Sequence, residues 1–459
     1  MKTAYDQYDV NTATVLYQSF YVYNNRPGLR IGTYHGINSF YVDVALNVTQ
    51  RTETTFHSKT IQAIVSSEEE LRTIGYEEEG KRIMCCDSYS KAMNKCKREG
   101  TFILPDNRRS AFLLAERKIQ RANSNVHFHF DIPREGKYWL LLGLCDVERQ
   151  HVDLHGEVTV MNAYGHLPAT LLGYIPFLFC LIVFCSCQWV LWIVLCALHV
   201  RDLMGIHYLI FAVLSSFVVS ASFEFLFYRA FNRDGAAHAL YHFAFTVSKA
   251  VAKALLHVLL ILAAMGVGIT RDCLGAVLWQ VVLLGASIIL TTLWAAESSA
   301  MLGAFSVSLP RTGAASLVEA VWLLWLLCAL EETLQTLAST KQITKLVVFL
   351  RLRKVVWGVL AVVVGYCVLF SFPLLEAASE RWWKLQWFFM EGVWWCVWLV
   401  ILAAVEFLWR PLDNSRAYAR HVEIATDESR DAVENESLQD YSGAIQVSAV
   451  PDASLKAMT

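Results

Sequence analysis

The sequence predicts a membrane protein with an α-helical bundle of seven transmembrane spans, preceded by a β-sandwich domain. Seven long apolar stretches lie between residues 170 and 409. A more polar block, residues 1–165, comes before them and carries short alternating runs. Hydrophobic residues make up 55% of the chain and charged residues only 17%, a composition far from that of an ordinary soluble domain.

Each apolar stretch is long enough to cross a bilayer. A hydrocarbon core about 30 Å thick needs about 20 apolar residues per helix. The predicted spans are 170–199, 208–229, 239–268, 276–296, 315–337, 346–372 and 384–409. The chain therefore divides into a head (1–165), a helical domain (166–410) and a tail (411–459). The tail is acidic and poor in aromatic residues, so we expect it to be disordered.

The charges near the span ends predict the orientation. Ten Lys and Arg residues lie on the side of the tail and five on the side of the head. The positive-inside rule then places the head in a lumen or outside the cell, and the tail in the cytosol. Residues 1–30 hold no apolar signal segment. We therefore expect either that a signal precedes the given start, which we prefer, or that the first span carries the head across.

Cysteines and one glycosylation sequon agree with a lumenal head. Four of the twelve cysteines lie in it: Cys85, Cys86, Cys96 and Cys145. In an oxidising compartment they would form two disulfides, and three pairings are possible. Their spacing does not suit a zinc site. Asn47 begins the sequon Asn-Val-Thr and is a candidate glycosylation site.

The sequence pattern of the head predicts a set of β-strands. Runs rich in β-branched and aromatic residues are separated by turn residues, which favours a sandwich. The predicted strands are 14–23, 39–47, 126–132, 137–145 and 155–160. The stretch from about 66 to 121 is more polar and is expected to be partly helical.

We find no catalytic, phosphate-binding or metal motif in the head, and no cofactor is expected. His127 and His129 would face the same side of a strand. We expect satisfied or solvent-facing histidines rather than a metal pair. The chain has no basic tract that would bind nucleic acid.

The end of the head resembles a known family. Its motifs are Phe128–Phe130, Glu135–Leu142, Cys145 and Gly156–Pro168. They are similar to the corresponding region of GOLD-domain seven-transmembrane (GOST) proteins, which include the lung seven-transmembrane receptor group. The resemblance implies a GOLD-like β-sandwich that ends in an Asn-x-Tyr-Gly-x-Leu-Pro junction.

The resemblance continues through the spans to about residue 420. Its motifs are Trp192–Leu203, Ile206–Tyr208, Gly266–Gly275 and Trp409–Pro411 with Asn414. They look like the family's first cytosolic turn, the turn after its third span and its exit from the seventh. Residues 1–125 show no such resemblance.

Ionisable side chains within the predicted spans mark a candidate site. Such groups are costly in a bilayer and are functional by default. Lys249, Lys253 and His257 follow a spacing of four and share one face of the third span. Their nearest acidic candidates are Glu224 in the second span and then Glu391 in the seventh.

Two interpretations of this stripe stay open. Either Lys253 and a glutamate form a structural pair, or the stripe lines a cavity for a lipid headgroup, another amphiphile or an ion. The family resemblance implies a cavity between the spans with basic residues of the third span beside it. We expect five glutamates to be interfacial or solvated at the span ends: the Glu331–Glu332 pair, Glu406, Glu297 and Glu319.

Other seven-span classes fit poorly. The seventh span has no deep lysine for a retinal Schiff base, since Lys384 lies at its edge. Rhodopsin-like receptor motifs, transporter repeats and a paired-aspartate protease centre are not found.

The expected function is therefore a non-enzymatic one in membrane trafficking or cargo sorting, in the Golgi and endosomal system. Expected partners are a membrane lipid in the bundle, lumenal cargo at the head and cytosolic trafficking machinery at the tail. The alternatives are an orphan signalling receptor and an ion channel or its regulator.

Overall fold

A computed structural model describes the protein in residues 2–9, 15–22, 40–50, 59–78, 81–105, 112–119, 123–145, 152–269, 275, 277–301, 309–371 and 383–411. The predicted disorder of the tail lies outside these residues. The described chain forms two compact units. One contains residues 1–177, 225–242 and 382–389, and the other holds most of the helical domain.

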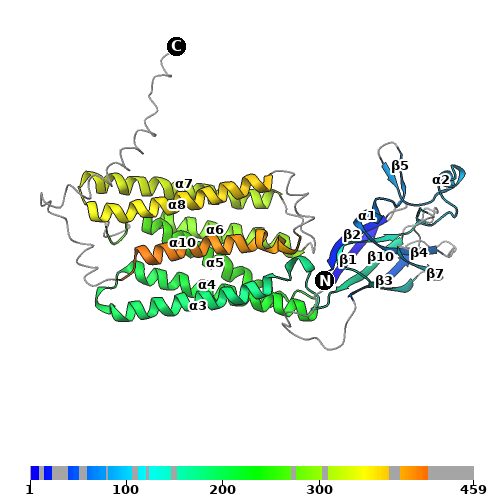
Figure 1. Cartoon of the computed structure of the whole chain (residues 1–459), viewed down its shortest axis with the longest axis horizontal. Helices are drawn as coiled ribbons and strands as arrows, with labels where there is room; N and C mark the ends of the chain where they lie inside the picture. The colour runs from blue at the N-terminus through cyan, green and yellow to red at the C-terminus, as the bar shows by residue number, and fades with distance from the viewer. Residues whose placement is uncertain are drawn as a thin grey trace, which may run out of the picture. The chain divides into compact units, whose positions relative to one another are not determined.

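In its described residues, the head contains two four-stranded antiparallel sheets and one short hairpin (Figure 1). The first sheet has the order β1-β10-β3-β8 and the second the order β2-β9-β4-β7. The strands are β1 Lys2–Asp9, β2 Val15–Val22, β3 Phe40–Gln50, β4 Lys59–Ser67, β7 Leu113–Ile119, β8 Asn123–Ile132, β9 Gly136–Gly143 and β10 Val152–Met161. The hairpin pairs β5 Tyr76–Glu78 with β6 Lys81–Ile83, and α1 Glu68–Leu71 and α2 Ser88–Ala92 are the head's helices.

The core of this sandwich is formed by strands whose side chains alternate between buried and exposed positions. In β3, Val42, Val44, Leu46 and Val48 are buried, whereas the residues between them are not. This period of two turns one row of side chains inward and the other outward. The inward rows of both sheets form one continuous cluster. The prediction of a β-sandwich is therefore confirmed.

The two central strands of the second sheet, β4 and the second half of β9, are buried on both faces. Ile64 of β4 and Leu141 of β9 point away from the main core and contact a smaller cluster. Two disulfides stabilise this region, Cys85–Cys145 and Cys86–Cys96. They select one of the three pairings that the sequence allowed.

All five predicted strands are present, with ends shifted by a few residues. The sequence prediction missed β1, β4, β7 and the β5–β6 hairpin. It read β7 and the hairpin as part of a polar, partly helical stretch from about residue 66 to 121, and it predicted no strand at β1 or β4. β4 lies inside its sheet and buries Ile61, Ala63, Ile64 and Val65 in succession, so it lacks the alternation that marks a half-exposed strand.

After the head, the described residues form six long helices and one shorter one (Figure 1). They are α3 Tyr174–Leu198, α4 Gly205–Asp234, α5 Ala239–Ala264, α6 Val277–Met301, α7 Leu309–Ser339, α8 Ile343–Ser371 and α10 Val393–Leu408. α10 is preceded by a 3-10 turn, η4 Trp383–Leu385, and by a π-helical segment, η5 Phe388–Gly392. Each predicted span corresponds to one of these helices.

Four of the helical segments, within the described residues, meet strict length and hydropathy criteria for crossing a membrane. They are Ala169–Leu198, Gly205–Asp234, Ala239–Ala264 and Val277–Ala296, and α10 is a shorter apolar helix. Ionisable residues lie along α7 and α8, among them Glu319, Glu331, Arg351 and Arg353.

Candidate functional site

The candidate site is a stripe of ionisable residues inside the helical bundle. Lys249, Lys253 and His257 lie on α5, and a spacing of four places them on one face. At a rise of 1.5 Å per residue, the stripe extends over about 12 Å. The structure brings it together with Glu224 of α4, Glu391 of η5 and a third carboxylate of α7.

Lys249 bridges two carboxylates. Its Nζ lies 3.1 Å from Oε1 of Glu224 and 2.8 Å from Oε2 of Glu391. The Glu224 side chain is only 1% exposed and that of Lys249 17%, whereas that of Glu391 is 42% exposed. A buried carboxylate is strongly destabilising unless a cation and hydrogen bonds satisfy it. Lys249 provides that cation, so Glu224 and Lys249 hold α4 and α5 together.

Aromatic rings surround this triad. The ammonium group of Lys249 lies 5.7 Å from the ring centre of Trp395 and 5.9 Å from that of Phe245. Trp395 is buried and packs edge-on against Phe217 of α4. Cation–π contacts of this kind add to the stabilisation of a desolvated ammonium.

The next cation, Lys253, pairs with Glu319 of α7. The sequence prediction named Glu224 and Glu391 as the nearest acidic candidates for the stripe, and both contact Lys249. It placed Glu319 at a solvated span end, and that expectation is wrong for a geometric reason. α7 begins at Leu309, so Glu319 lies well inside the helix rather than at its edge. Glu224 instead lies at the level of Lys249.

The third residue of the stripe, His257, has a side chain that is held in one orientation. Its Nδ1 lies 2.6 Å from the carbonyl oxygen of Lys253, and because a carbonyl only accepts, Nδ1 is the donor. The ring meets Trp322 of α7 edge-on at 4.2 Å between centres. Trp322 Nε1 also donates to the carbonyl of His257 at 3.3 Å. His257 therefore packs α5 against α7.

The charges of the stripe nearly balance. Two lysines face three carboxylates, Glu224, Glu391 and Glu319. An anion entering the stripe would compete with carboxylates for each lysine. Glu391 and Glu319 are the most exposed members, at 42% and 41%, and are therefore the ones that a ligand could displace or contact.

Glu391 lies in an unusual backbone segment. Residues 388–392 form a π-helix between a 3-10 turn and α10. Single π-helical turns within longer helices occur frequently at functional sites. Here the π-helical turn presents Glu391 to Lys249.

The junction after β10 is a second organised feature. Asn162 pairs with Gly165 through both backbone hydrogen bonds, and its Nδ2 donates to the carbonyl of Leu167. From α4, Asn232 accepts from the backbone N–H of Leu167 at 3.0 Å and donates to the carbonyl of Tyr164 at 2.9 Å. The carbonyl of Asn232 accepts from the N–H of residue 166. Asn232 thus clamps the junction turn.

Gly165 is required at this turn. Its φ is +133°, and a Cβ there would lie 2.5 Å from the carbonyl oxygen of Asn232. Both the backbone angle and the close approach exclude a side chain.

The histidines of the head bind a carboxylate. His129 Nδ1 lies 2.5 Å from Oδ1 of Asp43, and His127 Nε2 lies 3.8 Å from the same atom. This hydrogen bond raises the pKa of His129. No group of three metal-ligating side chains occurs in the described part of the chain.

Asn47 is exposed on the same outer face of β3 as Asp43, so its side chain is accessible for glycosylation.

A family model described as GOST, seven transmembrane domain, matches residues 174–416, more than half of the chain. The chain belongs to the GOST seven-transmembrane family. This confirms the family resemblance, and the matched residues include the span-end motifs, whereas the junction motif precedes them. The match supports all seven helices as spans of the GOST domain.

Two relatives are similar to this GOST chain over longer ranges. Transmembrane protein 87B of Mus musculus is 25% identical over 288 residues, which are 61% of this chain and 50% of the relative. Transmembrane protein 87A of Xenopus tropicalis is 24% identical over 315 residues, which are 67% and 57%. The chain spans about half the length of the curated relatives it matches.

Sequence reasoning missed three residues of the GOST chain that the structure makes important. Glu319 was set aside, and Asn232 and Trp395 were not considered individually. The only signal for Asn232 is its place in a short polar segment, Asn232–Asp234, at the end of an apolar span.

Proposed function

We propose that this GOST protein is a non-enzymatic membrane protein of the Golgi and endosomal system that acts in trafficking or cargo sorting. In this proposal the helical bundle holds a lipid-like ligand and the head binds a lumenal partner. The single observation that carries the ligand part is Lys249, held between the buried Glu224 and the more exposed Glu391.

The charge balance indicates which lipid would bind. A zwitterionic headgroup, which carries a positive and a negative charge, would match the lysines and carboxylates of the stripe better than a purely anionic headgroup. Its phosphate would approach Lys249 or Lys253, and its cationic group would approach Glu391 or Glu319. Glu224 would stay paired with Lys249 in either state, because its burial makes separation costly.

The compartment is inferred from the chemistry of the head. Disulfides form and persist in oxidising compartments and are rare in the cytosol. The two disulfides of the head therefore favour a lumenal position. The distribution of Lys and Arg at the span ends supports the same orientation.

Lipid analysis tests the ligand. The purified full chain, Lys249→Ala and Lys253→Ala would be compared by mass spectrometry of co-purifying lipids. Lys354→Ala, which alters an exposed lysine of α8, is the matched control. We expect the two stripe variants to lose a zwitterionic phospholipid that wild type and control retain. Identical lipid profiles in all four samples would reject the ligand proposal.

Topology and role need separate measurements. In sealed microsomes we expect the head to resist protease and the tail to be cleaved. Fluorescence microscopy should locate the protein in Golgi and endosomal membranes.

Loss of the protein should then slow the transport of lumenal cargo. Nucleotide exchange on a G protein, or currents from the purified protein in bilayers, would instead favour the receptor or the channel alternative.

A further inference from the structure

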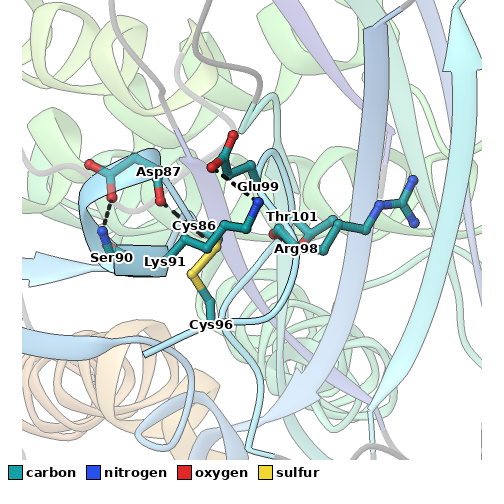
Figure 2. A network of polar contacts seen from close by, with 8 residues as sticks. All are labelled: Cys86, Asp87, Ser90, Lys91, Cys96, Arg98, Glu99 and Thr101. Carbon is teal, nitrogen blue, oxygen red and sulfur yellow. Dashed lines mark hydrogen bonds and ion pairs between the residues drawn. A yellow bond between two sulfur atoms is a disulfide. The ribbon is translucent and has the colours of Figure 1, made fainter. Parts of the chain in front are cut away.

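A small lobe of the head presents a surface that neither the fold nor the lipid site uses. It comprises residues 86–101, closed by the Cys86–Cys96 disulfide and containing α2 (Figure 2). We name it the α2 lobe. Its inner side is fixed to the head, because the hydroxyl groups of Ser90 and Tyr76 are hydrogen-bonded at 2.9 Å.

Several local contacts hold the α2 lobe in one shape. Asp87 caps α2 by accepting from the backbone N–H of Ser90 at 2.7 Å, and the hydrogen bonding with Ser90 lowers the pKa of Asp87. Asn94 takes a positive φ of 55° just after the helix, a conformation that Asn tolerates. Lys91 and Glu99 form an ion pair at 3.3 Å across the loop (Figure 2). The disulfide adds a covalent closure.

The outer side of the lobe combines apolar and cationic groups. Tyr89 and Met93 are 54% and 52% exposed. They are four residues apart and the N–H of Met93 bonds the carbonyl of Tyr89, so they share one side of the turn.

Basic residues are close to this apolar pair in the sequence, and the Tyr89 hydroxyl donates to the Glu78 carboxylate at 3.4 Å. Residues 88–99 contain four basic side chains, Lys91, Lys95, Lys97 and Arg98, against one carboxylate, Glu99. The Asp87 carboxylate is engaged at the helix cap. Arg98 extends away from the Lys91–Glu99 pair (Figure 2).

Three residues of this surface, Tyr89, Met93 and Arg98, are of types that are enriched at protein interfaces. A few such anchors carry most of the binding energy. A rigid surface also loses less conformational entropy when it binds.

We propose that the α2 lobe is the partner-binding surface of the head and that it binds an acidic polypeptide segment. Apolar residues of the segment would cover Tyr89 and Met93, and its carboxylates would face Lys97 and Arg98. The inference rests on the proposed partner-binding role of the head and specifies its surface and the class of partner.

A polypeptide suits the lobe better than other anions. A sulfated glycan would use the cations but leave Tyr89 and Met93 uncovered. An anionic membrane surface is usually bound through larger apolar groups such as Trp, Phe and Leu. These two ligands are tested as alternatives below.

The experiment uses the purified full chain in detergent and three probes. The first is a fluorescent peptide that combines glutamates with leucines, accompanied by a version in which glutamine replaces each glutamate. The second is a heparin oligosaccharide and the third is a phosphatidylserine vesicle. The variants are Lys97→Glu with Arg98→Glu, and Tyr89→Ser with Met93→Ser. The matched control is Arg117→Glu with Lys118→Glu, which makes the same charge change on exposed residues of the edge strand β7.

We expect the acidic peptide to bind wild type and the β7 control equally. Each α2-lobe variant should bind it at least about tenfold more weakly, because charge and apolar contacts both contribute. The glutamine peptide should not bind. Peptide mapping of the Cys86–Cys96 disulfide in each variant would show that the lobe is intact.

Several outcomes would overturn the proposal. These are no binding of the acidic peptide, an equal loss in the β7 control, or binding of heparin or vesicles in its place. Lipids co-purifying with the same variants are measured in parallel. A lobe variant that keeps its lipid but loses the peptide separates this proposal from the lipid part of the proposed function.

Discussion

Lys249 and Glu391 are 142 residues apart in the chain, yet Nζ of the lysine lies 2.8 Å from Oε2 of the glutamate. The same ammonium group contacts Glu224, so one side chain joins α4, α5 and the π-helical segment before α10. Such a triad stabilises the bundle, and Glu391 is its more exposed carboxylate. The structural-pair interpretation concerned Lys253, and the contact of Lys253 with Glu319 agrees with it. The ligand interpretation stays a proposal.

Removal of Lys249 should destabilise the bundle strongly. Lys249→Met leaves Glu224 buried without its cation, and we expect the free energy of unfolding to fall by about 3–5 kcal/mol. The double variant Lys249→Met/Glu224→Gln should recover much of this loss. Thermal unfolding in detergent, arranged as a double-mutant cycle, measures the coupling. Strictly additive effects would show that the pair is not coupled. Glu319→Gln provides a comparison, and its cost should be smaller because Glu319 is 41% exposed.

The junction clamp should depend on both functions of the Asn232 amide. Asn232→Ala removes the acceptor for Leu167 and the donor for Tyr164, so the loss should be about 2 kcal/mol, or ~1 kcal/mol for each hydrogen bond. Asn232→Asp keeps an acceptor and loses the donor, so it should be intermediate. Unfolding followed by tryptophan fluorescence would rank the three proteins. Equal stability of wild type and Asn232→Ala would contradict the clamp.

The two disulfides should contribute unequally to stability. Cys85–Cys145 spans 60 residues and Cys86–Cys96 only 10. The loop-entropy model predicts that the longer loop contributes about 1.5 kcal/mol more. The paired variants Cys85→Ser/Cys145→Ser and Cys86→Ser/Cys96→Ser would be compared by denaturant unfolding. Non-reducing peptide maps should first recover these two links, and a different pairing would refute this assignment.

The His129–Asp43 contact predicts that the head is less stable at higher pH. Its hydrogen bond raises the pKa of His129 above the unfolded value of about 6.5. The stabilisation is therefore fully present below pH ~6.5 and is lost as the pH rises through the raised value. Both side chains are partly exposed, so the effect should be modest. His129→Gln and Asp43→Asn should each reduce the slope of unfolding temperature against pH, whereas His155→Gln on β10 serves as the control. An unchanged slope in His129→Gln would assign the pH dependence to other groups.

The sequence predicts the fold better than the site. Length and hydropathy locate all seven helices, since crossing a bilayer demands a long apolar segment. Alternation locates β3 and β8, which have one exposed face, but not β4, which is buried on both. The stripe on α5 follows from spacing alone, because it lies within one helix. The pairing of Lys253 with Glu319 could not be predicted, since it depends on how far α7 extends and on the rotation of two helices.

The Asn232 clamp has a consequence for the design of chimeric proteins. A swap of heads between relatives that is cut at residue 165 would combine the junction turn of one protein with the α4 of another. Donor and acceptor positions on the two sides would then match only by chance. Segments 225–242 and 382–389 group with residues 1–177 in one compact unit. The transferable module is therefore discontinuous in the chain, and exchange of all three segments together would keep the turn with its own asparagine.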